Sequence, residues 1–372
     1  MTQSAALLFL ALSAAAPAPT PLPPVVSPEV HADRRVTFRL RHPAAKEVVV
    51  SGEWGRERPA MARDAAGDWT LTLGPLEPGV YGYGFIADGF QMVDPANSQV
   101  KLARSPRTSI VEVPGATPLV DTFQDVPHGT VHLHTYWSKS LGRARGLTVY
   151  TPPGYDKDAA ARFPALYLLH GNGDNEHTWV SLGRAHFILD NVLAQTKAAG
   201  FVLVMVDSHA IYPTPSTPDG PRANALAVEG DLLEDVIPYV ESRYRVKADA
   251  RGRAVAGVSM GGAQALLVGL RHPEVFAWVL GLSADIRDAQ AWLDAISPDA
   301  KAVNERLAML WVTIARSDAR LEANQKLVDL LKAKGVAVAF DLHDGAHNWP
   351  QWRLYLAQIA PRLFVEKTAA VR

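Results

Sequence analysis

One segment, residues 253–270, restricts the fold more than any other part of the 372-residue chain. It joins the apolar run R-A-V-A-G-V to the turn G-V-S-M-G-G (257–262), and then to the Ala- and Leu-rich stretch A-Q-A-L-L-V-G-L. A Gly-x-Ser-x-Gly pattern alone would occur by chance in about one chain in ten of this length. Here the apolar run indicates a strand buried on both faces, and the stretch after the turn indicates a helix. The segment therefore predicts a tight strand-to-helix turn with Ser259 at its apex.

The chain from about Asp125 onward alternates strand-like apolar runs with helical segments. Two helices are predicted, one at 232–244 with a kink at Pro238, and one at 321–334 that stops at Gly335. This alternation predicts an α/β fold over residues 120–366, with a mostly parallel sheet flanked by helices. The predicted strands are 163–170, 201–206, 253–258, 277–282 and 309–315, followed by a last strand in V-A-V-A-F-D-L.

Residues 29–115 have a different pattern of short β-rich segments separated by turn residues. Trp69, Leu71 and Leu73 alternate with threonines, as expected for a strand with one buried face. This region therefore predicts a small all-β, immunoglobulin-like sandwich in front of the α/β domain. Its predicted strands are 36–40, 47–51, 69–73, 80–87 and 109–113.

The N-terminus carries an apolar run from Ala5 to Ala16, followed by a proline-rich stretch. The run is too short to span a bilayer and is typical of the apolar core of a secretory signal peptide, although no Lys or Arg precedes it. The alternative is an Ala-rich start without a targeting role. We interpret residues 1–18 as a signal peptide and 19–28 as a proline-rich linker, and expect a secreted or periplasmic protein.

Charge and cysteine content exclude several classes of function. Lys and Arg number 37 against 38 Asp and Glu, so we expect neither a nucleic-acid nor a membrane partner. The absence of cysteine excludes disulfides, thiolate metal sites and a cysteine nucleophile. His132 and His134 would share one strand face, but no third ligand lies near them in the sequence. We therefore expect no metal and no cofactor.

A serine at a strand-to-helix turn is typical of a nucleophile elbow, although it could also be a bystander in a Gly-rich turn. An activated serine needs a histidine base, and in the α/β-hydrolase fold that we predict the histidine follows the serine in the chain. Only His272, His343 and His347 do so. His272 ends the helix after the turn, where capping is expected, and His343 lies at the end of the last strand. We favour His347, because it lies in the loop after that strand.

The acid that orients the base should follow an earlier strand. Asp318 comes three residues after the strand W-V-T-I-A and is our candidate. The alternatives are Asp285, which follows the preceding strand, and Asp341 and Asp344, which are close to His347 in sequence.

The oxyanion of a tetrahedral intermediate needs two preorganised N–H donors. One should be the backbone of Met260, directly after the nucleophile, and the other should come from a loop after an early strand. The sequence L-L-H-G-N-G-D-N fits that loop, and we predict that Asn172 donates its N–H while Gly171 contacts substrate. His170 is interpreted as structural.

Seven segments of this region resemble the putative-esterase (esterase D-like) family. That family includes feruloyl and acetylxylan esterases of carbohydrate esterase family one, siderophore esterases and mycolyltransferases. The resemblance implies a catalytic triad of Ser259, Asp318 and His347. The chain departs from the family where Arg316 and Asn172 replace common glycines. The matching segments are D-V-P-H-G (125–129), V-Y-T-P-P-G-Y (149–155), L-Y-L-L-H-G-N-G-D (166–174), I-L-D-N (188–191), D-L-L-E-D-V-I-P-Y-V-E (231–241), R-A-V-A-G-V-S-M-G-G (253–262) and G-A-H-N-W (345–349).

The N-terminal module resembles the early-set, family 48 carbohydrate-binding domains that precede such xylan esterases. The resemblance is carried by S-G-E-W (51–54), the stretch 69–89 and D-P-A-N (94–97). It implies that Trp54 stacks on sugar faces. The alternative is that Trp54 is a core residue, as we expect for Trp69.

These resemblances imply an exported serine esterase that removes feruloyl or acetyl groups from plant xylan through an acyl-enzyme. Trp179 and Trp349 would line an aromatic acyl pocket, the alternative being ordinary packing. Two other functions stay open: hydrolysis of a siderophore or other ester, or acyl transfer, and glycan binding by a chain with an inactive hydrolase domain. The expected partner is a polysaccharide or a small ester.

Overall fold

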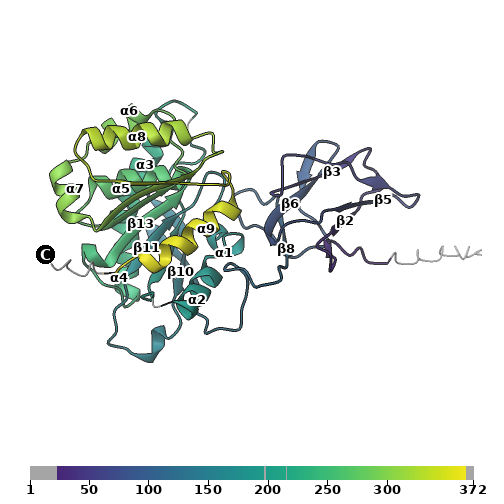
Figure 1. Cartoon of the computed structure of the whole chain (residues 1–372), viewed down its shortest axis with the longest axis horizontal. Helices are drawn as coiled ribbons and strands as arrows, with labels where there is room; N and C mark the ends of the chain where they lie inside the picture. Colours follow the sequence, from purple (N-terminus) through teal and green to yellow (C-terminus); the bar gives the residue numbers. More distant parts are fainter. Residues whose placement is uncertain (1–22, 197, 215, 366–372) are drawn as a thin grey trace, which may run out of the picture.

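A computed structural model describes residues 23–196, 198–214 and 216–365, which form two bodies joined along the chain (Figure 1). The N-terminal body consists of antiparallel sheets, and the larger body consists of one eight-stranded sheet with helices on both faces. The predicted signal peptide (1–18) and the first part of the predicted linker lie outside the described residues. No described helix is long and apolar enough to cross a membrane.

The N-terminal body is a sandwich of two four-stranded sheets. Their inner faces share an apolar core that includes Phe38, Val50, Trp69 and Phe85, and Trp69 is buried as predicted. All five predicted strands are present. The three unpredicted strands are only two or three residues long, too short for an alternating pattern. One sheet has the order β1 (Glu29–Val30), β2 (Val36–Arg41), β5 (Asp68–Leu73), β4 (Ala62–Arg63); the other has β3 (Val48–Gly52), β6 (Gly79–Ala87), β7 (Phe90–Met92), with β8 (Ser109–Val113) on β6.

The larger sheet is parallel except for β10, which is antiparallel to both of its neighbours. The predicted strands are β11 to β16, and the unpredicted β9–β10 hairpin forms the edge of the sheet opposite β16. The carboxyl ends of the parallel strands all lie on the same side of the sheet, so the loops that follow these strands converge there. The order is β16 (Ala339–His343), β15 (Met309–Ala315), β14 (Trp278–Leu282), β13 (Arg253–Val258), β11 (Ala165–Leu169), β12 (Val202–Val206), β10 (Arg143–Thr151), β9 (Thr130–Ser138).

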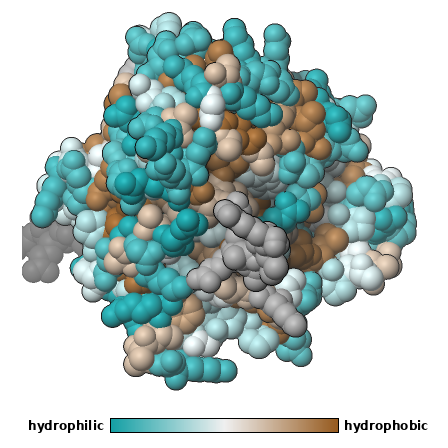
Figure 2. Space-filling view, turned by 60° about the vertical axis from the view of Figure 1, so that its left-hand side comes forward, coloured by the Kyte–Doolittle hydropathy of each residue, from teal (hydrophilic) through white to brown (hydrophobic). Residues whose placement is uncertain are grey.

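Helices cover both faces of this sheet and enclose two apolar clusters. Hydrophilic side chains cover most of the surface that Figure 2 shows, with hydrophobic ones mainly toward its middle. One face carries α1 (Thr178–Ser181), α2 (Ala185–Gln195) and α9 (Trp349–Ile359); the other carries α3 (Gly220–Asp231), α4 (Ile237–Arg243), α5 (Met260–Arg271), α6 (Ala289–Ile296), α7 (Ala300–Arg306) and α8 (Leu321–Ala333). Short 3₁₀ turns are η1 (Tyr155–Lys157), η3 (Ala250–Gly252) and η4 (Ala360–Arg362).

The helix predicted at 232–244 is the second part of a longer helical stretch that begins with α3. Before Pro238 the chain forms a π-helical turn, η2 (Leu232–Val236), and then continues as α4. Proline has no N–H to donate to the preceding turn, so the chain widens there before the helix resumes.

The two bodies touch through α9, which runs toward the sandwich in Figure 1. Arg353 on this helix donates to the carbonyl oxygens of Val80 in β6 and of Leu182. Its guanidinium also pairs with Asp121 at 2.6 Å, and the Arg353 side chain is buried. A buried, paired arginine therefore connects the sandwich to the helix that follows the loop of His347.

Candidate active site

Ser259 stands between β13 and α5 with φ 55° and ψ −118°, a strained conformation for a residue other than glycine. The glycines beside it allow a close backbone approach. A Cβ on Gly257 would lie 2.3 Å from the Gly261 carbonyl oxygen, and a Cβ on Gly261 would lie 2.6 Å from that of His170. The predicted tight turn is therefore present, and its geometry is that of a nucleophile elbow.

His347 and Asp318 meet Ser259 at the carboxyl ends of the parallel strands. Nε2 of His347 lies 3.0 Å from Oγ of Ser259, and Nδ1 lies 2.7 Å from Oδ2 of Asp318. The carboxylate accepts a hydrogen bond from Nδ1–H, which leaves the Nε2 lone pair to accept a hydrogen bond from the serine hydroxyl. The structure thus joins the three sequence candidates in one chain of hydrogen bonds.

Asp318 is held in place from two sides. Oδ1 accepts from the backbone N–H of Arg320 at 3.0 Å, while Oδ2 faces His347. Burial alone would raise the pKa of Asp318, but the hydrogen bonds from His347 and Arg320 outweigh it and keep the pKa below the ordinary value of 3.8. The carboxylate is therefore ionised at neutral pH and can stabilise an imidazolium at His347.

The lowered pKa of Asp318 predicts an acid-dependent contribution to stability. A depressed folded-state pKa gives stability that is present above the unfolded value and lost as pH falls through the folded one. We expect the difference in unfolding free energy between wild type and Asp318→Asn to shrink from about pH 6 to about pH 3. Urea unfolding at each pH measures it, and a difference that grows on acidification would contradict the assignment of the shift.

The rival histidines have other partners. His272 bonds Glu229 through Nε2 at 2.7 Å and Glu274 through Nδ1 at 3.1 Å, at the end of α5. His343 packs against the ring of Tyr355.

The rival carboxylates are likewise engaged elsewhere. Asp341 accepts from Nε1 of Trp311 at 2.7 Å, Asp285 pairs with Arg320 at 2.8 Å, and the exposed Asp344 lies 3.5 Å from Arg316. Among the alternatives weighed, Asp318 is the carboxylate bonded to His347.

The loop of residues 171–174, called the 171–174 loop below, passes beside Ser259. A Cβ on Gly171 would lie 3.4 Å from Cβ of Ser259, at ordinary contact distance, so the backbone of the loop runs directly beside the serine. Met260 opens α5, and its neighbour Gly261 donates to the His170 carbonyl at 3.1 Å. Asn172 is exposed on the loop. The donor roles of Met260 and Asn172 stay predictions.

His170 and His209 support this loop. Nδ1 of His170 lies 2.8 Å from the Gly171 carbonyl, and its Nε2 accepts from the N–H of Ser208 at 2.8 Å. Nε2 of His209 accepts from the N–H of Gly173 at 3.2 Å, and burial lowers the pKa of His209 to about 3, which keeps it neutral. His209 was not among the sequence candidates, because its partner lies on another strand's loop.

Trp179 and Trp349 pack in the apolar core of the esterase body. Their exposed fractions are 1% and 2%, and the rings meet edge to face with centroids 5.0 Å apart. Nε1 of Trp179 also donates to the Leu169 carbonyl. These contacts favour the packing alternative, and the lining of an acyl pocket by the two rings stays a prediction.

This burial predicts a large stability effect. We expect Trp179→Ala to lower the unfolding free energy by about 3–5 kcal/mol, because it removes a fully buried ring. Urea unfolding measures it. The matched control is Trp137→Ala, whose ring is 64% exposed, with an expected change within about 0.5 kcal/mol. Similar losses in the two variants would contradict the packing role.

Trp54 packs within the sandwich. Its ring centroid lies 5.4 Å from that of Phe38 and 6.1 Å from that of Tyr81, and a Cβ on Gly52 would lie 2.3 Å from the ring. The side chain is half-buried. These contacts favour the core alternative, and sugar stacking by Trp54 stays a prediction.

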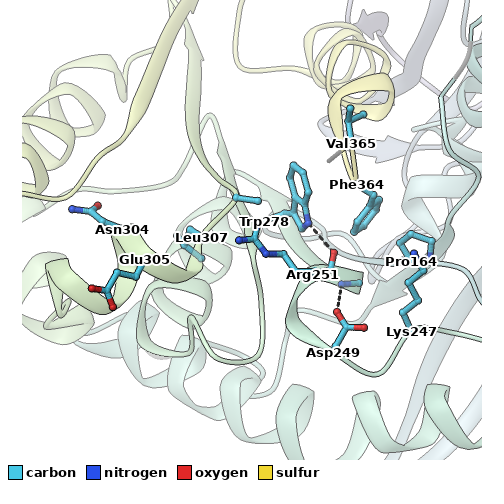
Figure 3. A pocket seen from close by; sticks show the side chains of 12 residues that line it. Pro164, Lys247, Asp249, Arg251, Trp278, Asn304, Glu305, Leu307, Phe364 and Val365 are labelled. Carbon is cyan, nitrogen blue, oxygen red and sulfur yellow. Dashed lines mark hydrogen bonds between the residues drawn. The ribbon is translucent and has the colours of Figure 1, made fainter. Parts of the chain in front are cut away.

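A cavity of about 670 Å³ lies away from this site. Figure 3 shows the side chains that line it. Its lining includes Lys247, Arg251 and Trp278, which lie at the amino ends of the parallel strands. Ser259 follows the carboxyl end of β13. The cavity therefore lies at the opposite ends of the strands from the Ser259 site.

Comparison with known proteins identifies the class. The family model described as "Putative esterase" matches residues 138–363, so the chain belongs to this family of α/β-hydrolase-fold proteins.

One relative is an endo-1,4-beta-xylanase/feruloyl esterase of Xylanibacter ruminicola, 32% identical over 91% of this chain and 46% of its own length. The chain thus spans about half the length of the first curated relatives that it matches. A solved ferulic acid esterase is 25% identical, with a TM-score of 0.54 over 64% of this chain and 99% of its own. The enterobactin esterase of Shigella flexneri shares the fold over 89% of this chain and 94% of its own, with 20% identity and a TM-score of 0.65.

Proposed function

We propose that the protein is a serine esterase that removes feruloyl or acetyl groups from plant cell-wall xylan through an acyl-enzyme. The hydrogen-bonded chain from Asp318 through His347 to Ser259, at a strained elbow, carries this proposal. The similarity to the Xylanibacter endo-1,4-beta-xylanase/feruloyl esterase and to the solved ferulic acid esterase supports the substrate class.

In the proposed mechanism Ser259 Oγ attacks the ester carbonyl while His347 Nε2 takes its proton. His347 then gives that proton to the leaving sugar oxygen, and Asp318 stabilises the imidazolium in between. The backbone N–H groups of Met260 and Asn172 receive the oxyanion. Water activated by His347 finally cleaves the acyl-enzyme and restores the serine.

The substrate test compares methyl ferulate with acetylated xylan under identical conditions. We expect one of the two to have a kcat/KM at least tenfold above that of the other, since pocket contacts of a few kcal/mol separate such acyl groups. Catecholate serine esters of the siderophore type form the third arm. A kcat/KM highest on that arm would overturn the xylan proposal while keeping the esterase chemistry.

We also propose that the protein acts outside the cytoplasm and that the sandwich binds polysaccharide. The apolar run from Ala5 to Ala16 supports the first proposal. Cell fractionation with a C-terminal tag tests it, and retention in the cytoplasm would contradict it. Co-sedimentation of the full chain with insoluble xylan tests the second, and the absence of sedimentation would leave the sandwich as a partner of the esterase body alone.

A further inference from the structure

A short stretch of the N-terminal module, residues 101–104 between β7 and β8, reaches into the esterase body beside the candidate site. It is called the 101–104 segment below. The backbone N–H of Leu102 donates to Oγ of Ser181 at 3.1 Å, and the Leu102 carbonyl accepts from Oγ1 of Thr178. These bonds anchor the segment along α1, next to the 171–174 loop.

Two residues of the segment hold two successive residues of that loop. Nζ of Lys101 lies 2.6 Å from Oδ1 of Asp174, and the two side chains are 19% and 4% exposed. The backbone N–H of Arg104 donates to the Gly173 carbonyl at 3.2 Å. Since His209 accepts from the N–H of Gly173, the Gly173 backbone is held through both its donor and its acceptor.

The Arg104 side chain fixes the segment against the end of β12. Its NH2 nitrogen lies 2.6 Å and 2.5 Å from the two carboxylate oxygens of Asp207, and the guanidinium lies 4.4 Å from the centroid of the Tyr212 ring. Burial acts to raise the pKa of Asp207, but basic neighbours, His170 first and then Arg145 and Arg104, hold it well below its usual range. The Asp207 carboxylate is thus charged and paired with Arg104.

Lys101 also touches the side of the site that carries the base. Its Nζ lies 5.6 Å from the centroid of the Trp349 ring, within cation–π range. Trp349 opens α9, two residues after His347. One ammonium group of the N-terminal module therefore contacts both the 171–174 loop and the start of the helix that follows the base.

We propose that Lys101 and Arg104 are positioning residues of the esterase site, which fix the 171–174 loop so that its N–H donor faces the developing oxyanion. This inference rests on the proposed function, because it assumes the oxyanion role of that loop. Oxyanion stabilisation depends on donors placed to within fractions of an ångström, so loosening the loop slows the chemical step more than it weakens substrate binding. The N-terminal module thereby becomes part of the catalytic apparatus.

The test uses the full chain with Lys101→Met, which keeps the length of the side chain and removes its charge. With p-nitrophenyl acetate we expect kcat to fall about 10- to 100-fold and KM to change less than about threefold. Lys101→Arg restores a cation and should recover most of kcat. The matched control is Glu112→Gln, which breaks another pair across the two bodies, Arg184 to Glu112 at 3.9 Å, and should keep kcat.

The outcomes separate the two levels of the proposal. Turnover that persists in Ser259→Ala would overturn the proposed function itself. If Ser259→Ala is inactive but Lys101→Met keeps the wild-type kcat, the positioning role alone is overturned. This holds even if the melting temperature of Lys101→Met falls. An equal loss of kcat in Glu112→Gln would likewise overturn it, because the effect would then belong to the interface in general.

Discussion

Ser259→Ala is expected to lower kcat for p-nitrophenyl acetate by about 10⁶-fold, because the alcohol that forms the acyl-enzyme is gone. The fold should persist, since within the described residues the Ser259 side chain is hydrogen-bonded to His347 alone. Stopped assays at high enzyme concentration measure the residual rate, and circular dichroism confirms folding.

The control for this variant is Ser242→Ala, near the C-terminal end of α4. The Ser242 hydroxyl donates to the Tyr239 carbonyl. It should keep the wild-type rate. A phosphonate that labels wild type covalently should leave Ser259→Ala unmodified. Labelling of another serine at the wild-type rate would contradict the assignment of the nucleophile.

Gly261→Ala is expected to damage stability and activity together. The new Cβ would lie 2.6 Å from the His170 carbonyl oxygen and 2.7 Å from the Leu169 carbonyl carbon. These are backbone atoms at the end of β11, which is bonded to strands on both sides and has little freedom to move. We expect a loss of about 2–4 kcal/mol in unfolding free energy and at least a hundredfold loss of kcat, measured by urea unfolding and steady-state kinetics.

The matched control is Gly230→Ala in α3 of the same body. There the new Cβ would meet only Cβ of Ser140 at 3.9 Å, and alanine is the better helix former. A gain of up to about 1 kcal/mol is expected. A Gly261→Ala protein as stable and active as this control would show that the elbow tolerates a side chain and would refute the close-approach argument.

The elbow and its partners could be predicted because each depends on a local pattern. The apolar run before Ser259, the helix after it and the loop position of His347 are all readable within a few residues. The parallel sheet then brings these side chains together, because the loops after successive strands all lie at the carboxyl ends of the strands. Asp318 and His347 therefore meet although 29 residues separate them.

The environment of the site could not be predicted in the same way. Nothing local distinguishes a buried Trp349 from one that lines a pocket, because either placement suits an aromatic residue at the start of a helix. The contacts of Lys101 and Arg104 depend on how the two bodies dock, and Arg104 meets Asp207 across 103 positions. The β9–β10 edge hairpin likewise mixes polar and apolar residues without a clear single period.

The bond from Arg353 to the Val80 carbonyl joins positions 273 residues apart. A contact of such separation forms late, because the intervening chain must first be ordered. The sandwich is made before the esterase body during synthesis, because Ser259, Asp318 and His347 all follow it in the sequence. A nascent or clipped chain that ends before the loop of His347 would carry the proposed nucleophile without its base. The proposed hydrolytic competence is therefore acquired only after α9 is made and packs against a module that precedes it in the chain.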